Sequence, residues 1–404
     1  MSSALQPLSP VGDPNEPTAH GIGQSTLRAI GFLSFYDRFA TAPMIVSIAS
    51  QRHIEFASAA MLVTVYALCY AIGQPVWGIV SDRVGRLRVI RIALIGAIAF
   101  SLATVASPTF TVLLVSRAGC GLFVGALFPA VLTLIGDRHV GVARVREVSA
   151  VQTFTALGTT LATLTAGALC TWTDWRIPFA ATAVGALVLL RISKGMPEPV
   201  ARDLGGGRDL RAAFGYRPVL LYVLGIVEGA LLLGIFTFIA PAIEHTGRST
   251  VAAGALAATY GVGIIAGSRL VRAVSTRIAL SGLIAVGGCL LVLALLVAAA
   301  GAASALALTV AAIMIGLSNS FLHGSLQTWA TSVAPAARAT TVSFFVGSVF
   351  LGSSLATSLA SPFVSRDLPA VFLVSAGLAA VLTVIAAPLR ARWATVRVRT
   401  RAAR

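Results

Sequence analysis

The chain has 404 residues, of which 57% are hydrophobic and only 11% are charged, and its formal net charge is +16. Charged residues make up about a quarter of an ordinary soluble chain, so this chain has too few of them to cover the surface of a soluble protein. The composition therefore excludes a soluble globular protein and predicts one whose solvent is a lipid bilayer.

The first 27 residues are rich in proline, serine and glycine and contain no apolar core. We expect them to form a disordered cytoplasmic tail rather than a signal peptide. A helix needs about 20 apolar residues to cross a bilayer, and the sequence predicts twelve transmembrane helices. They lie near residues 29–50, 58–80, 89–106, 110–135, 148–171, 177–195, 218–242, 251–273, 278–300, 304–330, 340–362 and 369–389.

The longest polar interruption includes three consecutive glycines and separates six predicted helices from six. The sequence thus predicts an all-α membrane protein with a tail at 1–27, an N-terminal half at 28–195, a flexible cytoplasmic linker at 196–217, a C-terminal half at 218–389 and a basic cytoplasmic tail at 390–404. An offset of 194 residues places Tyr66 on Tyr260 and Gly73 on Gly267. The two halves are therefore predicted to be parallel six-helix pseudo-repeats.

Most of the 30 basic residues lie in alternate loops of this arrangement. The basic segments are Arg28 and residues 83–91, 138–146, 191–217, 269–277, 338 and 390–404. Only Arg52, Arg176, Arg248 and Arg366 fall in the other loops. Basic loops stay on the cytoplasmic side, which predicts cytoplasmic termini and a location in the plasma membrane. No nucleic-acid partner is expected, because the charge is not gathered on a soluble module.

A short cationic turn joins the second and third predicted helices. Its arginines complement the negative end of a helix and face anionic lipid headgroups, and Gly85 permits a tight reversal of the chain. The pattern Gly78-x-x-Ser81-Asp82-Arg83-x-Gly85-Arg86 resembles the loop signature between helices 2 and 3 of the major facilitator superfamily of secondary transporters. This resemblance implies a cytoplasmic gating latch formed by Gly78, Asp82, Arg83, Gly85 and Arg86.

The resemblance covers about residues 28–390. Arg117-x-x-Cys120-Gly121 is similar to a helix 4 signature of the superfamily, although Cys120 replaces the usual glutamine. A proline-containing signature of drug antiporters in helix 5 is not met. The resemblance implies a transporter that works by alternating access, with a substrate site between its halves near the bilayer midplane.

Only two of the 14 acidic residues, Asp37 and Glu228, lie deep in predicted helices. Measured from Arg28 and Arg217, both sit roughly 15 Å into the bilayer at 1.5 Å per residue. An ionisable group at that depth is costly unless it is paired, protonated or in a wet cavity. Both acids are therefore candidate proton-coupling residues.

Asp37 has two possible arginine partners, Arg38 and Arg117. Because adjacent residues on a helix diverge by about 100°, Arg117 is the predicted partner. A moving arginine would switch Asp37 between holding and releasing a proton, whereas a static pair would only fix packing. The resemblance implies that Arg117 tunes the proton site on helix 1; a structural donor to helix carbonyls is the alternative. Glu228 is a second proton site, a group that binds a cationic substrate, or a neutral carboxyl that locks helices together.

Asn319, His323 and Gln327 recur every four residues on one face of a predicted helix. Lipid cannot satisfy such a face, so we expect it to line the cavity and contact substrate; hydrogen bonding between helices is the alternative. A lone histidine does not indicate a metal site. Further candidates for the cavity lining are Tyr36, Arg38, Tyr66 and Gln152.

The four cysteines show no metal-ligand spacing, and no nucleophile–base pair or phosphate loop is present. The sequence therefore predicts no cofactor, no metal and no enzymatic activity. It predicts a functional monomer that moves a small organic molecule together with protons. Export is favoured because the residues around Asp82 and Arg117 resemble exporter-rich branches of the superfamily. Proton-coupled uptake and a non-transporting receptor are the alternatives.

Overall fold

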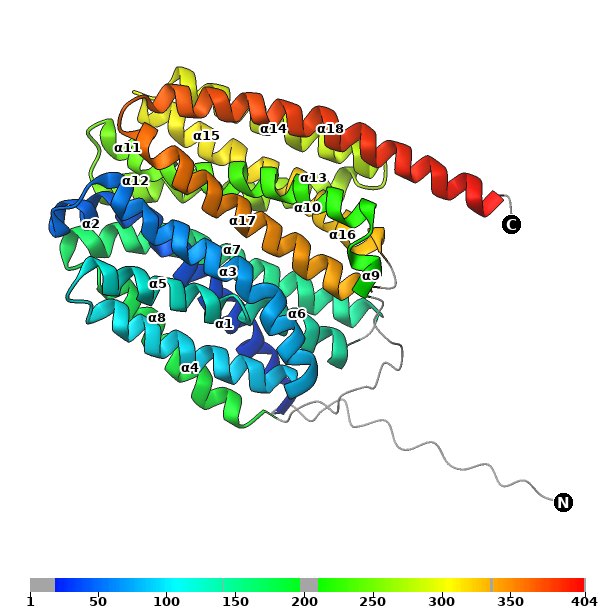
Figure 1. Ribbon diagram of the computed structural model, residues 1–404, viewed down its shortest axis with the longest axis horizontal. Coiled ribbons are helices and arrows are strands. Elements are labelled where there is room, and N and C mark those ends of the chain that lie inside the picture. The colour runs from blue at the N-terminus through cyan, green and yellow to red at the C-terminus, as the bar shows by residue number, and fades with distance from the viewer. Residues whose placement is uncertain (1–18, 140, 197–209, 335–336, 403–404) are drawn as a thin grey trace.

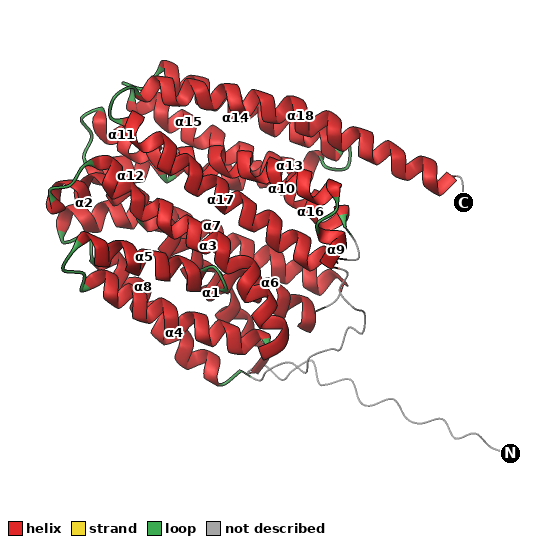
Figure 2. Cartoon of the chain, viewed as in Figure 1, coloured by secondary structure: helices red, strands yellow, loops and turns green. Residues whose placement is uncertain are grey.

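The computed structural model describes residues 19–139, 141–196, 210–334 and 337–402. Every regular element in these ranges is a helix, and Figure 2 shows the helices joined by short loops. Within this described part, eleven helices are long and apolar enough to cross a membrane. The protein is therefore a helical, multi-pass membrane protein. Helices suit a lipid environment because each backbone N–H and C=O group finds its hydrogen-bond partner within the same segment.

The helices follow one another through both halves of the chain. The N-terminal half contains α1 (Ala19–Ala40), η1 (Ala42–Met44), α2 (Ile45–Arg52), α3 (Phe56–Val84), α4 (Arg86–Val105), α5 (Phe110–Val124), α6 (Leu127–Arg138), α7 (Gly141–Trp172) and α8 (Ile177–Lys194). The C-terminal half contains α9 (Leu210–Ala213), α10 (Tyr216–Gly229), η2 (Ala230–Gly234), η3 (Ile235–Phe238), α11 (Ile239–His245), α12 (Thr250–Ala257), α13 (Thr259–Val274), α14 (Leu280–Ala300), α15 (Ala305–Ser318), η4 (Asn319–His323), α16 (Gly324–Val333), α17 (Arg338–Val364) and α18 (Leu368–Ala402).

Helix starts recur along the chain with the offset expected for two copies. Phe56 begins α3 and Thr250 begins α12, 194 residues later. Arg86 begins α4 and Leu280 begins α14, at the same separation. The order of helices thus agrees with the predicted parallel halves.

Three predicted boundaries need correction. α1 begins at Ala19, within the predicted tail, and Leu27 is buried in the N-terminal half. α18 continues to Ala402 through the predicted basic tail, and the predicted linker contains α9 and the start of α10. The polarity of the sequence predicts where the chain leaves the apolar part of the bilayer. It does not predict where a helix ends, because the backbone hydrogen bonds of a helix can continue into polar sequence. The rest of the tail and linker, residues 1–18 and 197–209, lies outside the described residues.

The first predicted transmembrane helix, residues 29–50, is not among the eleven apolar helices. The chain there forms α1, the 3₁₀ turn η1 and α2, with Pro43 inside the turn. Asp37 and Arg38 lower the hydropathy of this segment. The count of twelve therefore stays a prediction.

The helices run side by side between two ends of the molecule (Figure 1). We call the end where α9 lies and α18 terminates the α9 end, and the end that holds α2, α11 and the start of α12 the α2 end. Contacts between α3 and α17 and between α7 and α12 join the two halves.

The halves touch backbone to backbone near the α2 end. A Cβ atom added to Gly254 would lie 2.7 Å from the carbonyl oxygen of Thr163, and one added to Gly167 would lie 2.7 Å from that of Thr250. Nearby, the hydroxyl groups of Thr64 and Thr357 lie 2.8 Å apart and connect α3 to α17. These contacts close the α2 end.

Valine at position 254 is expected to open this end, because its side chain has no room beside α7. The distance between spin labels at Thr173 and Arg248, measured with the native cysteines replaced by serine, should gain a longer population in Gly254→Val. Gly377→Val is the matched control, since a Cβ there meets no heavy atom within 4 Å. Unchanged distances in Gly254→Val would show that the glycine contact does not hold the end shut.

Candidate functional site

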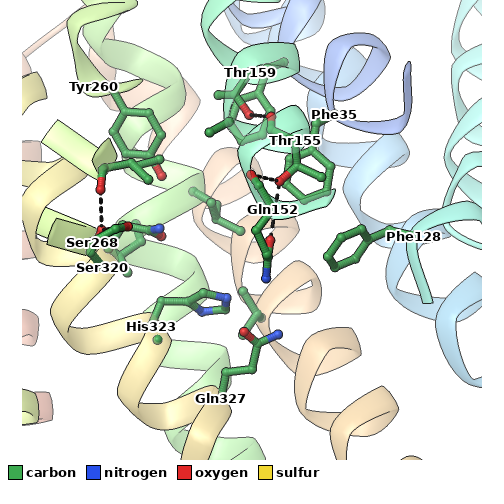
Figure 3. Close-up of a pocket in the computed structure, with 18 of the residues that line it drawn as sticks. Phe35, Phe128, Gln152, Thr155, Thr159, Tyr260, Ser268, Ser320, His323 and Gln327 are labelled. Carbon is green, nitrogen blue, oxygen red and sulfur yellow. Dashed lines mark hydrogen bonds between the residues drawn. The ribbon is translucent and has the colours of Figure 1, made fainter. Parts of the chain in front are cut away.

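A cavity of about 670 Å³ lies between the two halves. Its walls come from α1, α3, α6 and α7 on one side and from α10, α13, α16 and α17 with η2 and η4 on the other. Figure 3 shows Gln152 facing His323 and Gln327 across the space, with Phe35 and Phe128 on one flank and Tyr260 on the other. The volume is in the range of pockets that hold small molecules.

The cavity extends toward the α9 end. Arg269 and Arg272, exposed residues near the end of α13, belong to its lining. The opposite end is closed by the α7–α12 contact at Gly167 and Gly254. The described conformation is therefore accessible from the α9 end.

Glu228 and His323 form a hydrogen-bonded pair in the cavity wall. The Nδ1 atom of His323 lies 2.9 Å from Oε1 of Glu228, and the side chains are 26% and 1% exposed, respectively. The second oxygen, Oε2, is buried without a hydrogen-bond partner in the described part of the chain. A carboxyl group and an imidazole at this distance can share and exchange one proton.

Each of these two side chains adjoins a π-helical turn. η2 begins two residues after Glu228, and His323 is the last residue of η4. A π turn rotates the following residues relative to a regular α-helix, and such turns are frequent at functional sites. Both members of the pair therefore lie where their helices depart from regular α geometry.

Asp37 and Arg117 form a second pair that is fully removed from solvent. Nη1 of Arg117 lies 3.1 Å from Oδ1 of Asp37, and both side chains are 0% exposed. Nη2 of Arg117 also donates to the main-chain oxygen of Asp37 at 3.3 Å, and the guanidinium lies over the rings of Tyr66 and Phe179. The predicted choice of Arg117 over Arg38 as the partner is confirmed. Neither member of this pair lines the cavity in this conformation.

Arg38 does line the cavity. Its guanidinium carbon lies 4.0 Å from the ring centre of Phe350 and 4.7 Å from that of Phe39. Within the described residues it has no ion pair and no hydrogen bond. Helix geometry explains the contrast, because adjacent side chains point about 100° apart: Asp37 faces α5 while Arg38 faces the cavity.

The predicted polar face is present in the cavity. Asn319, His323 and Gln327 all belong to the lining, as does Gln152 from the other half. Tyr36 and Tyr66, also predicted in the cavity, are not among its lining residues. The Tyr36 hydroxyl instead contacts Thr165 at 3.0 Å, and Tyr66 packs under Arg117. Sequence shows that a tyrosine lies on a transmembrane helix, but not which neighbour its ring meets.

The residues of the predicted latch lie at the turn between α3 and α4. Gly85 has φ of 108° between the two helices, which confirms the predicted tight reversal. Gly78 faces α17, where a Cβ would lie 3.8 Å from Ser343 Oγ, and Arg83 is exposed. Arg86 contacts Asp137 at 3.5 Å and donates to Ser81. The Asp82 side chain lies outside the described part of the structure, so its partner stays a prediction.

Sequence reasoning missed two contacts that organise the ends of the molecule. Arg28 binds Glu147 at 3.0 Å and ties α1 to α7. Thr64 and Thr357 join the halves at the α2 end. The 194-residue offset between the repeats could not predict either contact. The first lies within one half, and the two threonines of the second do not occupy equivalent positions of the two repeats.

Comparisons with known proteins agree with this geometry. A family model described as Major Facilitator Superfamily matches residues 29–357. The nucleoside transporter NupG has a similar structure with a TM-score of 0.72 and 15% identity, covering 89% of this chain and 97% of that chain. A D-xylose-proton symporter gives 0.71 and 15%, covering 91% and 98%. A bacterial homologue of the human lysosomal transporter Spinster, inward-facing and occupied, gives 0.70 and 21%, covering 93% and 96%. At these identities the likeness shows a shared fold.

Proposed function

We propose that this chain, which belongs to the major facilitator superfamily and is a membrane transporter rather than an enzyme, couples proton movement to the export of a small organic molecule. The substrate occupies the cavity between the halves. The observation that carries the proposal is the Glu228–His323 pair, a protonatable pair in the cavity wall. Its second carboxyl oxygen, Glu228 Oε2, has no hydrogen-bond partner among the described residues.

Proton coupling requires a group that binds and releases a proton and whose proton affinity changes when substrate enters or leaves the cavity. Glu228 meets this requirement because the residue belongs to the cavity wall and its carboxyl group contacts the partly exposed ring of His323. Bound substrate changes the polarity around the pair, and the proton affinity of a carboxyl group follows that polarity. Release of the proton therefore accompanies a change in cavity occupancy.

Alternating access requires the two ends to open in turn. The contact between Gly167 and Gly254 closes the α2 end in the described conformation. Opening of that end is accompanied by closure of the α9 end, where we assign the latch role to Gly78, Asp82, Arg83, Gly85 and Arg86. Asp37 and Arg117 serve as a second coupling pair that rearranges as the N-terminal half moves.

Charge distribution supports the placement of the protein in the membrane. The exposed arginines Arg83, Arg269 and Arg272 all lie in basic segments that the positive-inside rule assigns to the cytoplasm. We therefore propose that the α9 end is cytoplasmic, that α1 with η1 and α2 is the twelfth transmembrane segment, and that the protein works as a monomer in the plasma membrane.

A flux experiment tests this function. Proteoliposomes with an imposed pH gradient are incubated with a mixed library of metabolites and drugs, and mass spectrometry measures the internal concentration of each compound. Export by proton exchange predicts accumulation of at least one compound in the acidic compartment, relative to protein-free vesicles. Accumulation in the alkaline compartment would instead establish the uptake alternative, and binding without flux would establish a receptor.

A further inference from the structure

We infer that the cavity selects an organic anion, a carboxylate or sulfonate with an apolar or aromatic body, and that Arg38 is the residue that binds its charged group. This inference rests on the proposed function and names the substrate class of the same cavity. It follows from the charges, partners and side-chain types on the cavity wall.

The cavity carries an excess of positive charge. Arg38, Arg269 and Arg272 belong to its lining, whereas Glu228 is the only acidic residue among the described lining residues. Glu228 is already in contact with His323. Clefts lined by one sign of charge concentrate ligands of the opposite sign, so a cationic substrate is disfavoured along this path.

Arg38 is placed as a binding group rather than as part of an internal ion pair. The neighbouring acid, Asp37, is held by Arg117, and the described residues offer Arg38 no carboxylate of their own. Phe39 and Phe350 hold its guanidinium by cation–π contacts. These contacts consume none of the guanidinium N–H groups, which can therefore donate to two oxygens of a carboxylate or sulfonate group through two parallel hydrogen bonds.

The other residues that line the cavity indicate the chemistry of the rest of the ligand. Phe35, Tyr70, Phe128 and Tyr260 supply aromatic walls. Asn319 and Gln327 supply side-chain amides that make no hydrogen bond within the described structure. The ligand therefore combines one anionic group at Arg38 with an apolar body and a small number of polar substituents.

Arg269 and Arg272 extend the positive charge to the opening. Both are exposed lining residues near the end of α13, and neither has an ion-pair partner in the described part of the chain. They would attract an anion to the α9 end and increase its local concentration. The cavity therefore presents arginines both at its entrance and at its binding position.

Matched compounds test the inference. Proteoliposomes are supplied with phenylacetate, octanoate and benzenesulfonate, and separately with phenylacetamide, octanamide, benzenesulfonamide and benzylamine. Protein-free vesicles correct for passive permeation. We expect saturable transport of the anions by the native protein, with weaker transport of the amides and of benzylamine. Arg38→Gln should raise the half-saturating anion concentration by about tenfold or more, since a charge-assisted hydrogen bond contributes at least the free energy of one decade in affinity.

Two control variants separate binding from structure. Arg38→Lys should retain part of the anion preference, and Arg191→Gln should retain all of it because Arg191 is exposed and outside the cavity lining. A purely structural Arg38 would reduce transport of anions and amides equally. Equal loss for both classes, unchanged anion transport in Arg38→Gln, or a preference for amides or benzylamine would overturn the inference.

The inference and the proposed function fail in different ways. If the mixed library yields a neutral or cationic substrate that moves with the pH gradient while no anion moves, the inference is overturned and the function stands. If anions bind and stabilise the native protein but no compound crosses the membrane, the function is overturned and the anion site stands.

Discussion

Glu228→Gln proteoliposomes should equilibrate the substrate across the membrane but should not accumulate it. With one proton per substrate and the membrane potential clamped, a gradient of one pH unit supports about a tenfold concentration ratio. We expect this ratio to fall to about one in the variant. The physical reason is that glutamine retains the shape and a hydrogen bond to His323 but cannot gain or lose a proton at neutral pH.

Glu244→Gln is the matched control for this experiment. Glu244 lies in α11 of the same half, contacts Thr250 at 2.7 Å and is not among the lining residues of the cavity. The control should accumulate substrate as the native protein does. Full accumulation in Glu228→Gln would remove Glu228 from the coupling mechanism and leave Asp37 as the remaining acid to test.

Arg117→Gln should strongly destabilise the protein, more than any loss of an exposed charge. Both members of the Asp37–Arg117 pair are 0% exposed, and removal of one partner leaves the other as an uncompensated buried charge. Such a change costs about 3 to 5 kcal/mol in the free energy of unfolding. Reversible unfolding in mixed micelles measures the change.

A double variant separates the ion pair from packing. Asp37→Asn combined with Arg117→Gln removes both charges and keeps most of the volume, so it should regain a large part of the stability lost in Arg117→Gln alone. The coupling free energy from this double-mutant cycle measures the interaction directly. If the two substitutions are simply additive, Asp37 and Arg117 do not stabilise each other and the pairing is energetically unimportant.

The sequence was sufficient for the helical architecture because bilayer solvation leaves few alternatives. Runs of about 20 apolar residues can only become transmembrane helices, and eleven of the predicted segments correspond to apolar helices of the structure. The segment with Asp37 and Arg38 is not among them, because these two charged residues lower its mean hydropathy. Helix ends were predicted less well, as α1 and α18 continue into polar sequence.

The site could be predicted only as far as helical periodicity reaches. Periodicity identified Asn319, His323 and Gln327 as one face and favoured Arg117 as the partner of Asp37. It could not reveal that His323 contacts Glu228, because that contact joins two separate helices and lies beside the irregular turns η2 and η4, which helical periodicity does not predict. For the same reason the position of the Arg38 guanidinium between aromatic rings emerged only once its neighbours were located.

The most direct test of proton-coupled transport is the internal pH of proteoliposomes when substrate is added outside. A pH-sensitive dye sealed in the lumen reports proton movement, while mass spectrometry records substrate entry in the same vesicles. Export by proton exchange predicts that the lumen becomes more alkaline as substrate enters, and that this change disappears in Glu228→Gln. Substrate entry with no pH change beyond that of protein-free vesicles would contradict proton coupling, and acidification of the lumen would contradict exchange in favour of symport.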